Sequence, residues 1–256
     1  MVAIHFTERV TDRLRKAASK GRDVTLADLP SPTYLSCLPL QPGARIRDAP
    51  CDAAGTRPGS GAAVSRARAL LRRWRVPLTL AVTLVALQAT GWTPALEYRR
   101  AAVLHGELWR LLTGSLVHLG WVHLARDLAG LFLIWGLFAC SLNEHSALWI
   151  LLVSMLSVGL CLLAFSPGIL WYVGISGALF GLFCAGALCE FRENPFFAGT
   201  LLLGMAAVVA WTLYAGALPG ETAGLGGRVV PQAHLYGAFG GAAFVLARAA
   251  RRAVWV

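Results

Sequence analysis

Gly174-Ile175-Ser176-Gly177 lies where a loop-like apolar segment passes into a hydrophobic run of membrane length. A serine between two glycines is unusual at such a helix entrance, because its hydroxyl adds little to packing and the glycines cost helix stability. The glycines also leave the serine oxygen approachable from several sides. Further along, Ala233-His234-Leu235-Tyr236-Gly237 opens the last apolar run and places an imidazole at its start. The two segments therefore predict a nucleophile and a base on two membrane helices.

The composition predicts a membrane protein. The chain is 57% hydrophobic and 14% charged, with a mean hydropathy of +0.61, which a soluble domain of this size seldom shows. A bilayer core about 30 Å thick needs roughly 20 helical residues. Six apolar runs of about this length predict an all-α, six-helix membrane bundle: 76–93, 112–138, 146–166, 173–190, 196–217 and 231–248.

The chain divides into two parts. Residues 1–65 are basic and rich in proline and glycine, which predicts a largely disordered extension with no cleavable signal peptide. Residues 66–256 form the expected membrane domain. The formal charge of +10 comes mostly from the first 75 residues. A basic flank on the cytoplasmic side of a first membrane helix explains that charge, and no nucleic-acid-binding motif accompanies it.

Charge placement gives the expected topology. Six spans put both termini on one side, and the arginines before residue 76 and after residue 247 indicate the cytoplasm. Arg192 falls inside as well, whereas Arg99, Arg100 and Arg228 fall outside. The second, fourth and sixth spans then begin at the outer face, so Ser176, His234 and the outer half of the second span, with His118 and His123, converge on one leaflet.

Serine needs a base to take its proton, and a neutral imidazole is the usual partner. Ser176 and His234 can meet only if their helices pack closely. Small residues four apart allow such an approach in lipid, and both helices carry them: Gly177 and Gly181 on one, Gly237 and Gly241 on the other. Phe180, one turn after Ser176, can stack on the imidazole or pack against lipid or the core.

His123 and Asp127 share one face of the second span. Ionisable groups in a membrane helix usually face a polar cavity, and His123 can donate to a developing oxyanion. Asp127 can donate only if protonated. As a carboxylate it would repel an oxyanion or orient a histidine, and Arg126 offers it an ion pair. The structural alternative is that the pair joins helices. His118 lies one residue off the His123 repeat, which predicts a different neighbour for it.

No metal or cofactor is expected. The six cysteines form no CxxC or His/Cys ligand cluster and fit the role of small apolar residues. A lone histidine is more often structural than catalytic, which is the interpretation for His5, His105 and His145.

At these residues the chain resembles the rhomboid family of intramembrane serine proteases. The matching pattern covers roughly residues 76–248 and joins four elements in order: Glu107-x-Trp109-Arg110, His118-x4-His123-x3-Asp127, Gly174-x-Ser176-Gly177 and His234-x2-Gly237-x3-Gly241. The Trp-Arg-Leu-Leu-Thr-Gly and Ala-His-Leu-Tyr-Gly blocks look most like the rhombosortase branch.

The resemblance implies a six-helix bundle with a cavity open to the outer face, in a bacterial inner membrane. Ser176 would be the nucleophile and His234 the general base, without a third carboxylate. The Ser176 N–H and His123 would bind the oxyanion. Trp109 and Arg110 would anchor the first outer loop, and His118 would brace it. The family usually has asparagine in place of Asp127. This departure puts in question the side-chain amide that asparagine would give the oxyanion hole, and it does not affect the dyad.

The implied substrate is a single-pass or C-terminally anchored membrane protein, cut near the outer end of its anchor. The rhombosortase resemblance narrows the anchor to a Gly-rich segment followed by an apolar helix and basic residues. Two other functions stay open: a catalytically inactive relative that binds membrane helices, which Asp127 favours, and a small transporter. A transporter would need polar residues in both halves of the bilayer, and the inner halves here look apolar.

Overall fold

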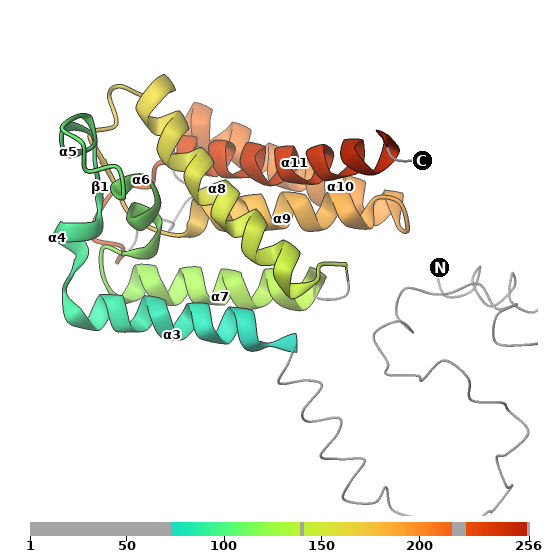
Figure 1. Cartoon of the computed structure of the whole chain (residues 1–256), viewed down its shortest axis with the longest axis horizontal. Helices are drawn as coiled ribbons and strands as arrows, with labels where there is room; N and C mark the ends of the chain where they lie inside the picture. The colour runs from blue at the N-terminus through green and yellow to red at the C-terminus, as the bar shows by residue number, and fades with distance from the viewer. Residues whose placement is uncertain (1–72, 139–140, 217–223, 255–256) are drawn as a thin grey trace, which may run out of the picture. The chain divides into compact units, whose positions relative to one another are not determined.

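The computed structural model describes residues 73–138, 141–216 and 224–254, with side chains to residue 251. The predicted extension, residues 1–65, lies outside them. Within these described residues, six long helices form the bundle shown in Figure 1. They are α3 (Arg75–Thr90), α7 (Trp121–Phe138), α8 (Glu144–Phe165), α9 (Ser176–Glu190), α10 (Pro195–Ala215) and α11 (Pro231–Val254).

The central helix is α9, which contacts α7, α8, α10 and α11. More than half of its residues are buried. The α3 helix lies beside α7 at the edge of the bundle (Figure 1). Because α9 begins at Ser176, the predicted nucleophile lies at the end of the most enclosed helix in the described part of the chain.

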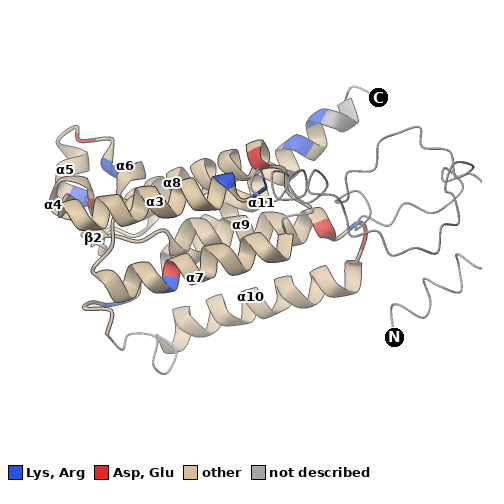
Figure 2. Cartoon of the chain, turned by 90° about the horizontal axis from the view of Figure 1, so that it is seen from below, with Lys and Arg blue, Asp and Glu red and all other residues tan. Residues whose placement is uncertain are grey.

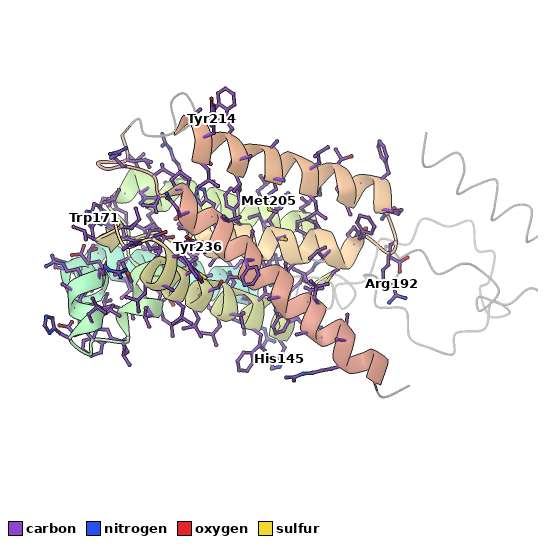
Figure 3. All side chains as sticks on the ribbon, turned by 90° about the horizontal axis from the view of Figure 1, so that it is seen from above. His145, Trp171, Arg192, Met205, Tyr214 and Tyr236 are labelled. Atoms are coloured by element: carbon purple, nitrogen blue, oxygen red, sulfur yellow. The ribbon has the colours of Figure 1, made fainter. Side chains whose placement is uncertain are left out.

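The membrane prediction holds for several helices by length and composition. Among the described residues, α7, α8 and α10 are long and apolar enough to cross a membrane, and α3 and α9 are shorter apolar helices. Charged residues lie mostly near the two ends of the bundle, with an adjacent acidic and basic residue on α7 (Figure 2). Figure 3 shows Trp171 and Arg192 at opposite ends, as expected for residues that precede and follow α9.

The predicted second span began too early. In place of one helix over 112–138, the chain forms α6 (Arg110–Thr113) and the 3-10 turn η4 (Gly114–Leu116) before α7 starts at Trp121. Val117 is extended, with φ −114° and ψ 158°. The segment is apolar because it is buried within the protein, and hydropathy alone does not distinguish such a loop from a membrane helix. His118 therefore lies before α7 and not within it.

A short sheet connects the first outer loop to the segment that enters α9. This loop also contains α4 (Thr93–Leu96) and α5 (Arg100–Leu104). Strand β1 (Tyr98–Arg99) pairs antiparallel with β2 (Trp171–Tyr172), with Tyr98 opposite Tyr172. Arg100 continues the pairing, since its N–H donates to the Leu170 carbonyl at 2.8 Å. The sheet fixes the backbone shortly before the Gly174-Ser176 turn.

Arg110 holds this loop together. Its guanidinium is buried and donates to the carbonyls of Pro94 and Glu97 at 3.2 and 2.8 Å, and to the Glu107 carboxylate at 2.6 Å. One charged group therefore satisfies three acceptors on both sides of β1, which is the geometry that stabilises a buried cation. Its neighbour Trp109 is half exposed on the same loop.

The predicted glycine contact between α9 and α11 is confirmed. A Cβ atom at Gly237 would overlap the carbonyl oxygen of Gly177, and one at Gly241 would overlap that of Gly181. On the other side, a Cβ at Gly177 would lie 2.8 Å from the Ala233 carbonyl oxygen. Only glycine permits this backbone approach, and it brings the first turns of the two helices together.

Candidate active site

Ser176 and His234 meet at the start of these two helices. The Ser176 Oγ atom lies 3.1 Å from His234 Nε2, which is hydrogen-bond distance for a serine and its base. Ser176 is partly exposed, and His234 is only 6% exposed. The two residues are 58 positions apart in the chain, so the close packing of α9 on α11 is what brings them into contact.

Phe180 orients the imidazole. Its ring stacks on His234 with centroids 4.3 Å apart and planes 8° from parallel. Of the interpretations open from the sequence, stacking is the one that the structure contains. A flat apolar surface against one face of the imidazole restricts rotation of the ring, so Nε2 remains directed at Ser176.

The turn before Ser176 is held by several contacts to its backbone. Gly174 has φ +115°, and a Cβ there would lie 2.7 Å from His123 Cε1, so both conformation and space require glycine. The Gly174 N–H donates to the Gly114 carbonyl at 3.2 Å, and its own carbonyl accepts from the Tyr172 hydroxyl at 2.6 Å. Burial raises the pKa of the Tyr172 phenol far above its usual range, so the phenol stays a protonated donor.

His123 is held with a proton available for donation. The Leu119 N–H donates to His123 Nδ1 at 3.5 Å, which places the proton of the neutral ring on Nε2. His123 Nε2 lies 3.6 Å from Asp127 Oδ2, beyond ordinary hydrogen-bond length. The ring also meets His118 edge to face, with centroids 5.1 Å apart.

Asp127 makes two hydrogen-bond contacts through one oxygen. Its Oδ2 atom lies 3.1 Å from the Ile175 N–H nitrogen and 3.1 Å from His118 Nε2. His118 was expected to face a different neighbour from His123, and this expectation was wrong: because the chain before α7 is not helical, both rings point toward Asp127. Of the possible roles of Asp127, these contacts support two, the orientation of a histidine and the connection of segments.

These residues open onto one cavity of about 1110 Å³. Its lining includes the catalytic candidates on three helices and the chain segments on either side, among them Ser176, His234, His123, Asp127, Phe180, Tyr172, Arg126 and Arg228. His118 is buried behind His123, and the paired glycines lie at the helix contact. The described residues contain no group of His, Cys, Asp and Glu that could hold a metal ion.

Sequence reasoning missed three contributors to the site. Gly114 and Tyr172 support the Gly174 backbone, and Ile175 supplies the N–H that reaches Asp127. The aromatic pair Trp171-Tyr172, which one residue separates from Gly174, was the available signal for Tyr172. The other two act through backbone atoms, which residue types do not reveal.

The apolar helical bundle defines an integral membrane protein of the all-α class. Comparison with known families then identifies it further. The Rhomboid domain matches residues 105–251, more than half of the chain, so the chain belongs to the rhomboid family. The members of this family are typically serine proteases that act on membrane proteins within the bilayer. A search of curated proteins found no match.

Proposed function

We propose that this chain is an intramembrane serine protease that cleaves membrane-anchored proteins through a Ser176–His234 dyad. The observation that carries the proposal is the 3.1 Å contact between Ser176 Oγ and His234 Nε2 at a cavity in a helical membrane bundle. Membership of the rhomboid family supports the same class of reaction.

The reaction follows from the placement of the protons. His234 Nε2 accepts the hydroxyl proton as Ser176 Oγ attacks the substrate carbonyl carbon, and the protonated imidazole then donates to the leaving amine. A water molecule deprotonated by the same imidazole hydrolyses the acyl-enzyme and releases Ser176. Phe180, stacked on the ring, keeps Nε2 on the line between serine and substrate.

The negative charge of the tetrahedral intermediate needs donors. The Ser176 N–H lies at the start of α9, where helix N–H groups lack acceptors within the helix. His123 carries its proton on Nε2 and lines the same cavity. Together these two groups form the proposed oxyanion hole, and loss of one such donor typically costs about a hundred- to a thousandfold in rate.

The proposed setting is a bacterial inner membrane crossed six times, with both termini in the cytoplasm and the cavity toward the outer face. The proposed substrate is anchored by one helix and cut near its outer end. Within the rhomboid family we favour the rhombosortase branch, whose anchors would be C-terminal and Gly-rich. The contacts of Arg110 and His118 support a proposed role for both in holding the loop at this face, and we assign Trp109, which is half exposed on the same loop, to anchoring it.

Cleavage in proteoliposomes tests the proposal. Purified wild-type protein and the Ser176→Ala and His234→Ala variants are incubated with single-pass substrates that have or lack a Gly-rich C-terminal anchor, and products are identified by mass. We expect cleavage near the outer end of the anchor by the wild type alone. Binding of anchors without cleavage by any of the three proteins would favour the inactive relative instead.

A further inference from the structure

Asp127 makes two contacts through one oxygen. The Oδ2 atom of this buried residue accepts the Ile175 N–H and lies at hydrogen-bond distance from His118 Nε2, each at 3.1 Å. A backbone N–H can only donate, so Oδ2 is an acceptor in that bond.

The two groups that contact Asp127 Oδ2, the His118 ring and the Ile175 N–H, belong to different segments. His118 lies in the chain between η4 and α7, and Ile175 is the residue directly before the proposed nucleophile. Asp127 itself is on α7, which contacts α9. The carboxylate therefore connects the first loop, α7 and the entrance of α9 at one atom.

Three hydrogen bonds hold the turn formed by Gly174 and Ile175, and the bond from the Ile175 N–H to Asp127 is the one next to Ser176. The other two fix Gly174 from Gly114 and Tyr172. Because Gly174 has a positive φ and lies against the His123 ring, a change in this turn moves both the Ser176 N–H and the position of Ser176 Oγ. A displacement of about 1 Å at a reacting group can cost on the order of a hundredfold in rate.

His123 remains available to substrate in this arrangement. Its Nε2 atom is 3.6 Å from Asp127 Oδ2, whereas His118 takes the shorter contact. Asp127 Oδ2 thus makes its shorter contacts to Ile175 and His118, and the Nε2–H of His123 is not hydrogen-bonded to Asp127.

From these contacts we infer that Asp127 is a positioning residue, which accepts the Ile175 N–H and so fixes the turn that carries Ser176. The inference rests on the proposed function for its effect on rate.

Two substitutions show whether the turn needs an acceptor at residue 127. Asp127→Asn keeps a carbonyl oxygen for the Ile175 N–H, whereas Asp127→Leu has a similar shape and no acceptor. Hydrogen exchange of the Ile175 amide is measured by mass spectrometry in the Ser176→Ala background, which needs no activity. We expect the Asp127→Asn variant to protect this amide like the parent, and the Asp127→Leu variant to exchange it about tenfold faster, the loss of one hydrogen bond.

The rate of labelling by a fluorophosphonate probe supplies the second measurement. With Ser176 intact, we expect Asp127→Asn to label within about tenfold of wild type and Asp127→Leu at least about a hundredfold more slowly.

Each result has one meaning. Equal Ile175 exchange in the Asp127→Leu and parent proteins would overturn the inference. If Asp127→Leu does not fold, Asp127→Asn still decides: an Ile175 amide that exchanges about tenfold faster than in the parent would overturn the inference, and an equally protected amide would support it. If the wild type is not labelled at all but its Ile175 amide is protected, the proposed function and the effect of Asp127 on rate are both overturned. The hydrogen bond from the Ile175 N–H to Asp127 would still be supported.

Discussion

Replacing Gly237 with alanine tests the helix contact that brings the two proposed catalytic side chains together. The added Cβ would overlap the Gly177 carbonyl oxygen on α9. Ordinary carbon–oxygen contacts need at least 3.4 Å, so α9 and α11 must separate by roughly 1 Å or more at this point. Overpacking of this kind typically costs about 1–3 kcal/mol of stability.

The effect on chemistry is larger than the effect on stability. Ser176 is one residue from Gly177, and His234 is three residues from Gly237, the two glycines that would clash. The Ser176 Oγ–His234 Nε2 distance is 3.1 Å, so a helix separation near 1 Å breaks this hydrogen bond. A displacement of that size predicts a loss of about a hundredfold in reactivity. The assay is the rate of fluorophosphonate labelling in detergent, with thermal unfolding followed on the same samples.

The matched control is Gly204→Ala on α10, where an added Cβ meets no atom within 4 Å. Alanine favours a helix over glycine by up to about 1 kcal/mol, so this variant should label at the wild-type rate. Labelling of Gly237→Ala within about twofold of Gly204→Ala, on folded protein, would refute the idea that the glycine contact sets the dyad geometry.

Three further predictions address the surroundings of the dyad. Phe180→Leu keeps apolar bulk but loses the stacking on the imidazole, so labelling should slow by about three- to tenfold, the equivalent of roughly 1 kcal/mol; an unchanged rate would contradict an orienting role. Arg110→Ala removes the donor to the Pro94 and Glu97 carbonyls and to the Glu107 carboxylate and should cost about 1.5–3 kcal/mol in thermal unfolding, against less than about 1 kcal/mol for Arg99→Ala at an exposed ion pair; equal shifts would argue against loop anchoring. Tyr172→Phe removes the donor to the buried Gly174 carbonyl and should cost about 1–3 kcal/mol, with a melting temperature equal to wild type as the contrary result.

Much of this arrangement was predictable because it depends on residue types at fixed spacing. The order of the six apolar runs matches the order of the long helices, and the Gly177–Gly181 and Gly237–Gly241 pairs form the predicted contact. Glycine at four-residue spacing has a direct steric consequence, so the sequence indicates it clearly. The number of membrane crossings remains a prediction, since three helices among the described residues meet the length and composition expected of a span.

The first outer loop was less predictable. Residues 112–120 are apolar because they pack inside the protein, and this burial imitates the start of a membrane helix in a hydropathy profile. Because the chain is not helical before α7, His118 lies next to His123 and Asp127, which the sequence did not predict. Backbone contacts, such as the Ile175 N–H on Asp127, depend on tertiary placement and leave no signal in residue types.

The serine between two glycines, where the sequence first pointed, is also where the proposed dyad is tested most directly. Wild-type protein and the Ser176→Ala and His234→Ala variants are treated with a fluorophosphonate, digested and mapped by mass spectrometry. A Ser176–His234 dyad predicts one adduct, on Ser176, in the wild type, none in Ser176→Ala and strongly reduced labelling in His234→Ala. Equal labelling of all three proteins, or an adduct on another residue, would contradict the dyad.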